Sequence, residues 1–155
     1  MRWIALLLCL SPLVASAEAS KMTVSVVSGS NAPKSYNYPV DADKHVLDLR
    51  AIHRYDAAFE DPATKRQICR EGMYKTGLLL TLRALPKTAD GSQPVEIIGQ
   101  VSNFNGITPG KILKCGTNQE VSLSTTAFSD TIQVEKDRTK VVAIDGSYTI
   151  MVKVQ

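Results

Sequence analysis

The sequence predicts a mainly β fold, an antiparallel β-sandwich or open barrel of about seven or eight strands with one short helix. The observations behind this prediction are alternating apolar and polar residues, turn residues between the alternating runs, and an Asp145-Gly146 pair joining the last two runs. Alternation with a period of two is typical of a half-buried strand. Asp-Gly between two such runs is typical of a β-hairpin with a type I′ turn.

The composition is that of an ordinary globular domain, with 155 residues, 44% hydrophobic and 21% charged. Residues 1–17 have the features of a secretory signal peptide: a basic start at Arg2, an apolar stretch, and the small-x-small site Ala15-Ser16-Ala17. That stretch is about half of the roughly 20 residues that cross a bilayer, so we expect no transmembrane segment. Residues 18–155 are predicted to form one exported β-rich domain, periplasmic or secreted.

The first half of this domain is predicted to hold two strands and a long loop. Lys21–Val27 alternates, with Met22, Val24 and Val26 on one face. Ser28–Asp43 is rich in Gly, Asn and Pro and is predicted to be a loop without regular structure. Val46–Ile52 is predicted to be the second strand, with Leu47, Leu49 and Ala51 on one face.

A short helix is predicted over Pro62–Glu71. Asp61-Pro62 has the residue types of a helix N-cap and first helical position, and Gly72 is placed to end the helix. Gly77–Leu85 follows as a strand that is apolar on both faces, which favours a central position in a sheet.

The remaining strands are predicted between turn residues. Val95–Val101 alternates, and Pro109-Gly110 after it fits a type II turn. The other predicted strands are Val121–Thr125, Thr131–Val134, Lys140–Ile144 and Ser147–Val154. In the final hairpin we expect Val141 to pair with Ile150 and Ala143 with Tyr148, so that Val141, Ala143, Tyr148, Ile150, Val152 and Val154 face the core.

Two cysteines, Cys69 and Cys115, remain after the signal peptide. An even number in an oxidising compartment predicts a single disulfide, with two separate buried thiols as the alternative. A redox catalyst would use a close C-x-x-C pair, which neither cysteine has.

No set of residues in the sequence indicates catalysis. No serine lies in the G-x-S-x-G motif of hydrolases, and Gly106–Ile112 lacks both the spacing of a P-loop and its magnesium-binding Ser or Thr. Asp41-Ala42-Asp43 begins like a calcium loop but has Val46 where that loop needs glycine. We therefore expect no enzymatic activity and no cofactor.

A metal site is not expected either. His45 and His53 are the only histidines. On one strand they would lie about 26 Å apart at roughly 3.3 Å per residue, too far to share an ion. Only a reversal of the chain between them would bring them together.

Charge gives little guidance to a partner. Loss of Arg2 with the signal peptide leaves 17 of the 18 Lys and Arg against 15 Asp and Glu, too even a balance to favour nucleic acid. The densest basic group has two interpretations, a patch for an acidic partner or a solvated face; its residues are Arg50, Arg54, Lys65, Arg66 and Arg70.

The predicted Ser28–Asp43 loop contains a possible binding site at Tyr36 and Tyr38. Long ordered loops are disproportionately functional, and tyrosine is enriched where proteins bind partners. The alternative is that both rings pack beneath the loop and cover an edge of the core.

The two ends of the domain resemble the subunits of bacterial pili assembled by donor-strand exchange. The matching residues are Met22, Val24 and Val26, which would form a donor strand, and Ile150, Val152 and Val154, which would form a terminal strand. Those subunits often have a tyrosine as their penultimate residue, whereas Tyr148 lies too far from the end of this chain to match it. The resemblance implies a structural or assembly subunit.

The leading hypothesis for function is a non-catalytic interaction module of the bacterial envelope that binds an unidentified protein or small molecule through its loops. A structural or assembly subunit of pilin-like type is the second hypothesis, and it predicts concentration-dependent oligomers at the sheet edges. A small hydrolase or metal-binding protein is the third.

Overall fold

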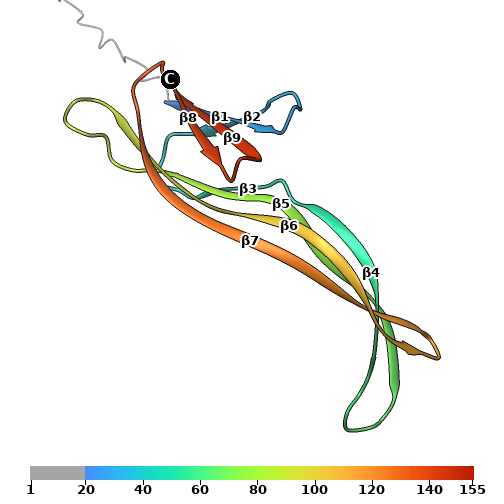
Figure 1. Ribbon diagram of the computed structural model, residues 1–155. Helices are drawn as coiled ribbons and strands as arrows, with labels where there is room; N and C mark the ends of the chain where they lie inside the picture. The colour runs from blue at the N-terminus through green and yellow to red at the C-terminus, as the bar shows by residue number, and fades with distance from the viewer. Residues whose placement is uncertain (1–19) are drawn as a thin grey trace, which may run out of the picture.

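The fold is two antiparallel sheets packed into a β-sandwich, as the sequence predicts, seen in a computed structural model that describes residues 20–155 (Figure 1). The predicted signal peptide, residues 1–17, lies outside the described residues. The described part of the chain holds nine strands: β1 (Lys21–Ser28), β2 (Lys34–Pro39), β3 (His45–Asp48), β4 (Ala51–Glu60), β5 (Gln67–Ala84), β6 (Gln93–Leu113), β7 (Gly116–Val134), β8 (Thr139–Ile144) and β9 (Tyr148–Val154).

One sheet has the strand order β2-β1-β9-β8 and the other the order β3-β5-β6-β7, with β4 also paired to β5. All the ladders between these strands are antiparallel. Strand β1 lies between β2 and β9, so both of its edges are paired within its own chain. The strand that the pilin resemblance identifies as a donor is therefore an internal strand of this domain.

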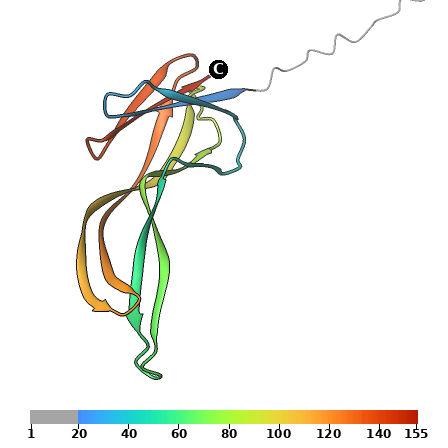
Figure 2. The same ribbon diagram turned by 90° about the vertical axis from the view of Figure 1, so that its right-hand side faces the viewer.

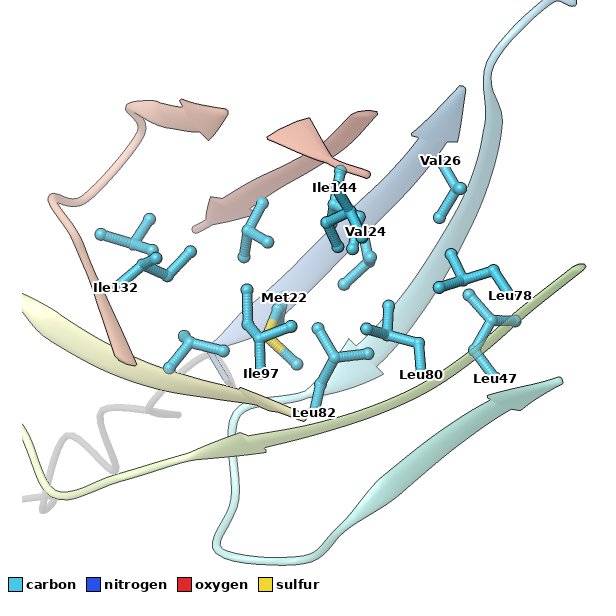
Figure 3. Close-up of a cluster of buried hydrophobic side chains, with 14 of the residues drawn as sticks. Met22, Val24, Val26, Leu47, Leu78, Leu80, Leu82, Ile97, Ile132 and Ile144 are labelled. Atoms are coloured by element: carbon cyan, nitrogen blue, oxygen red, sulfur yellow. The ribbon is translucent and has the colours of Figure 1, made fainter. Parts of the chain in front are cut away.

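The core lies between the two sheets. Met22, Val24 and Val26 of β1 point toward Leu78, Leu80 and Leu82 of β5 (Figure 3). All six side chains are buried, as the alternation along β1 predicts for Met22, Val24 and Val26. Each such side chain contributes roughly 1.5 to 3 kcal/mol through the apolar surface it removes from water.

Three strands are much longer than the sandwich requires. β5, β6 and β7 have 18, 21 and 19 residues, whereas strands in globular proteins usually have about 3 to 10. Their extensions leave the sandwich as two two-stranded ribbons, one of β4 and β5 and one of β6 and β7, which project from the same end of the domain (Figures 1 and 2). We call these ribbons the arm: residues 51–76 and 103–125.

The strand β5 changes partners at Gly77, where the arm begins. Up to Thr76 it pairs with β4, and from Gly77 onward it pairs with β6. Gly77 has φ of 116°, and a β-carbon there would lie 3.0 Å from the carbonyl oxygen of Leu49. Glycine is required because this φ and this close approach exclude a larger residue.

The prediction of a long loop over Ser28–Asp43 is only partly correct. Its middle, Lys34–Pro39, forms β2 and pairs with β1 along the edge of the sheet. Tyr36 and Tyr38 alternate with polar residues there and occupy half-buried positions. The turn residues of the segment therefore bound a strand instead of replacing it.

The helix predicted over Pro62–Glu71 is wrong, because the chain makes a hairpin turn between β4 and β5. Asp61 does act as a cap, accepting hydrogen bonds from the backbone N–H groups of Ala63 and Thr64. Lys65 then has φ of 57°, and its N–H donates to the Asp61 carbonyl oxygen at 2.8 Å. The left-handed conformation of Lys65 ends the helix after a single turn, and β5 begins at Gln67.

The predicted type II turn at Pro109-Gly110 is also wrong, since both residues belong to β6. The register between β6 and β7 shifts between Pro109 and Ile112, which marks a bulge, and a bulge is where a strand accommodates proline. On the other side of this ladder, the predicted strands Val121–Thr125 and Thr131–Val134 are parts of the single strand β7.

The predicted strand Val46–Ile52 divides between β3 and β4 at Leu49-Arg50. Leu47 is buried as expected, whereas Ala51 is exposed on the arm. The backbone N–H of Leu49 still donates to the carbonyl oxygen of Leu78 at 2.8 Å, which keeps the break close to β5.

The last hairpin has the predicted turn but a different register. Asp145 and Gly146 have φ of 50° and 63°, as a type I′ turn requires. Ser147 stays outside the ladder, so Ile144 pairs with Tyr148 and Val142 with Ile150. This one-residue shift corrects the predicted pairs Val141 with Ile150 and Ala143 with Tyr148. Ile144 faces the core, and Val141 is 57% exposed.

Candidate functional site

The arm has little buried apolar surface of its own. Between residues 51 and 76 and between 103 and 125, the buried hydrophobic residues are Ala58 and Leu113. The sixteen-residue core cluster lies in the sandwich. The arm is therefore held together by ladder hydrogen bonds and by specific contacts between its two ribbons.

Aromatic rings join the ribbons near the sandwich. The ring of Tyr74 on β5 stacks on Phe104 of β6 with a centroid separation of 5.5 Å, and it also stacks on His53 of β4 at 4.9 Å. Tyr55 lies against Tyr74 at 6.1 Å in a tilted arrangement. Pairs at such separations contribute about 0.5 to 1.5 kcal/mol beyond the area they bury.

A disulfide joins the ribbons near their tips. Cys69 of β5 is bonded to Cys115, which lies in the turn between β6 and β7, and their α-carbons are 6.1 Å apart. This is the pairing that the sequence predicts. Beside it, the Gln67 side-chain oxygen accepts a hydrogen bond from the Lys114 backbone N–H at 2.9 Å, and Lys111 pairs with Glu60 at 3.4 Å.

Exposed large hydrophobic residues gather on the arm. Eleven are found among the described residues, and eight of them belong to the arm: Ile52, Phe59, Ile68, Met73, Phe104, Ile107, Ile112 and Leu123. The most exposed of these eight are Ile112 at 80%, Met73 at 67% and Ile52 at 61%. Since scattered single residues need no explanation but a concentration does, the arm is the candidate binding surface.

The charged side chains of the arm have both signs. Arg54 pairs with Glu71 at 3.0 Å on the surface, and the Arg70 guanidinium lies 5.3 Å from the centre of the Phe59 ring. Arg50, which the sequence grouped with these residues, instead pairs with Asp48 at 2.8 Å outside the arm. The basic group is therefore divided among separate contacts, with Lys65 and Arg66 in the hairpin turn.

Tyr36 and Tyr38 lie on β2, where both rings pack against the core cluster. Tyr38 also stacks on His45 at 4.8 Å, and burial, with a smaller contribution from Tyr36, raises the pKa of its hydroxyl above the ordinary value. This placement matches the alternative interpretation of the two tyrosines, in which they cover an edge of the core. Their role in binding stays a prediction.

The histidines occupy separate environments. The His45 Nε2 atom lies 3.0 Å from a carboxylate oxygen of Asp41, and His53 Nε2 lies 2.7 Å from the Thr76 hydroxyl. In the part of the chain that the structure describes, no three His, Cys, Asp or Glu side chains are grouped so as to hold a metal ion.

Hydrogen bonding perturbs one carboxylate of the sandwich strongly. Arg50 donates to both carboxylate oxygens of Asp48 at 2.8 Å, which holds the pKa of Asp48 far below its ordinary value. The Asp61 carboxylate accepts from the Thr64 hydroxyl and from backbone N–H groups, and its pKa is lowered for that reason. Both groups act as local structural acceptors.

Sequence reasoning missed the exposed residues of the arm. Met73 and Ile112 carry no motif, and the apolar alternation around Phe104 and Leu123 is the same pattern that predicts a core strand. The length of the strands could have indicated the arm. Between β5, β6 and β7 the chain turns only near Asp90-Gly91 and Lys114-Cys115, so the residues between these turns form long continuous strands. Continuous long strands exceed what a small sandwich can cover.

Comparison with protein-family models, with curated proteins and with solved structures finds no match to this chain. Among residues 20–155 no helix is long and apolar enough to span a membrane. The class of protein is thus defined by the fold alone, a disulfide-linked β-sandwich with a projecting two-ribbon arm.

Proposed function

We propose that this protein is an exported, non-catalytic interaction module whose arm binds a partner protein. The observation that carries the proposal is the concentration of exposed large hydrophobic residues on the arm, eight of the eleven in the described residues. A concentration of exposed apolar side chains marks an interaction surface in soluble proteins.

The geometry of the arm favours a protein partner. Ile52 and Met73 lie on the same face of the β4–β5 ribbon, because Ile52 pairs with Lys75 and Arg54 with Met73. Around them the ion pair Arg54–Glu71 supplies both signs of charge. An apolar surface rimmed by mixed charges fits a protein interface, whereas a nucleic acid needs a basic one.

Export is proposed on two observations. Residues 1–17 have the sequence features of a signal peptide. The Cys69–Cys115 pair is compatible with an oxidising, extracellular compartment, because disulfides persist there. The periplasm and the external medium both meet this condition.

The test compares capture of envelope proteins by two matched double variants. Met73→Ser with Ile112→Ser removes the two most exposed apolar side chains of the arm. The control, Val46→Ser with Val141→Ser, removes two side chains that are 62% and 57% exposed but lie outside it. Neither pair belongs to the core, so both variants are expected to keep the wild-type melting temperature within a few degrees.

We expect the arm variant to lose at least about tenfold in affinity for whichever protein the wild type captures, which corresponds to roughly 1.4 kcal/mol. The control variant should capture the same protein at the wild-type level. Equal capture by both variants, or equal loss, would show that the arm is not the binding surface.

A further inference from the structure

Strand β7 is an open edge of the five-stranded sheet. It pairs with β6 along one side, and from Leu123 to Val134 that ladder runs without a bulge against Phe104 to Gln93. Along the other side of this stretch, no strand pairs with β7 among the described residues. Backbone N–H and C=O groups are thus left for an additional strand, with the Thr131 N–H donating to the Asp130 carboxylate at 2.7 Å.

Of the other edge strands, β2, β3 and β8 carry features that discourage pairing. β2 has six residues and includes Lys34 and Pro39, and β8 has six residues and includes Lys140. β3 has only four residues. Short edges, lysine and proline are the usual protections against added strands. β7, with 19 residues, contains no lysine, arginine or proline.

The side chains of β7 leave its edge accessible. Most residues from Ser124 to Thr131 are small or short and exposed. The one large side chain among them, Phe128, occupies the space that a β-carbon at Gly99 would need, so its ring leans toward β6. The ring therefore lies away from the open edge.

We propose that β7 pairs antiparallel with β7 of a second copy of this chain, which joins the two five-stranded sheets across a two-fold axis. A symmetric antiparallel pair places directly opposite residues on the same face of the sheet. Only registers in which even-numbered residues oppose even-numbered ones satisfy this condition, because the even-numbered side chains Ile132 and Val134 face the core in both copies.

Among these registers, those centred on Phe128 and on Ser129 use the open stretch most fully, and the side chains favour the one centred on Phe128. It sets Thr125 opposite Thr131, a pair of β-branched side chains that pack and hydrogen-bond well across strands. Asp130, the only charged residue between Val121 and Val134, then lies opposite the hydroxyl of Thr126. A register centred on Asp130 would instead place two carboxylates against each other.

The interface consists of one pair of strands, so the association should be reversible. One added strand buries less than the roughly 1,200 Å² of a standard stable interface. We therefore expect a monomer–dimer equilibrium that shifts with protein concentration.

Two double variants that differ only at position 125 test the register. Thr125→Lys with Thr131→Lys places like charges opposite each other in the dimer. Thr125→Glu with Thr131→Lys places opposite charges there. Within one chain the two positions are roughly 20 Å apart at about 3.3 Å per residue, so the pair interacts directly only across the dimer. Both side chains are exposed in the monomer.

Sedimentation equilibrium at low salt would measure the dimer dissociation constant of the full mature chain and of both variants. We expect the like-charge variant to raise this constant at least about tenfold and the opposite-charge variant to keep or lower it. A wild type that stays monomeric up to about 1 mM, or equal constants for the two variants, would overturn the proposal. The arm variants Met73→Ser and Ile112→Ser should leave the dimer unchanged, so this proposal and the proposed partner binding fail independently.

Discussion

Replacing both cysteines of the arm by alanine would separate the stability of the arm from that of the sandwich. The Cys69–Cys115 bond closes a loop of 46 positions. The chain-entropy relation gives about 4 kcal/mol for a loop of this length. The double variant would have its free energy of unfolding lowered by that full amount only if the arm and the sandwich unfold as one unit.

The structure favours a local effect. The arm contains two buried hydrophobic residues, Ala58 and Leu113, whereas the sandwich core contains sixteen. A segment with so few buried contacts opens at a lower free energy than the core. We therefore expect the double variant to lower Tm by less than about 5 °C, although 4 kcal/mol would lower it by about 12 °C at roughly 3 °C per kcal/mol.

Hydrogen exchange with thermal melting would distinguish the two cases. Amides of residues 51–76 and 103–125 should exchange at least about tenfold faster in the double variant, because the disulfide no longer holds the ribbon tips together. Amides of β1 and β9 should keep their wild-type protection. The wild type in reducing buffer provides the control without substitution. A Tm loss of about 12 °C with faster exchange in β1 and β9 would refute the reasoning.

Three further predictions concern the sandwich. Gly99→Val should lower the free energy of unfolding by about 1 to 3 kcal/mol in urea denaturation, because the added side chain takes the space of the Phe128 ring; an unchanged midpoint would contradict this packing. Tyr36→Ala with Tyr38→Ala should lower Tm by several degrees if both rings serve the core, whereas an unchanged Tm with at least about tenfold weaker partner capture would identify a binding surface. The pKa of Asp48 is lowered in the folded protein, so its ionised carboxylate stabilises the fold fully above the unfolded pKa of about 3.9, and this stabilisation is lost as pH falls further. The Tm difference between wild type and Asp48→Asn should therefore become smaller on acidification. A constant difference from pH 7 to about pH 2 would contradict this expectation.

The strands that build the core were predictable because their side chains alternate against one buried layer. Met22, Val24 and Val26 of β1 and Ile150 and Val152 of β9 follow this pattern and are buried. The register of the last hairpin was not predictable in the same way, because one extra residue in the turn changes which side chains face the core.

The arm was not predictable from sequence, for a physical reason. Phe104 and Leu123 alternate with polar neighbours as core residues do, yet the two are 47% and 39% exposed. Alternation reports which side chains share a face but not whether another layer covers that face. At Asp61 the capping signal was correct, and the left-handed conformation of Lys65 that ends the turn has no marker in the residue type.

The position of β1 between β2 and β9 has a consequence for the order of folding. Met22 pairs with Val154, so an internal strand of one sheet is completed by residues from opposite ends of the described chain. Because the chain is synthesised from its N-terminus, the β1 segment emerges long before its partner, and closing so large a loop carries a high entropic cost. The β4–β5 hairpin needs only local contacts and can form early. We therefore expect the arm ribbons to assemble before the sandwich, which is complete only when β9 is present.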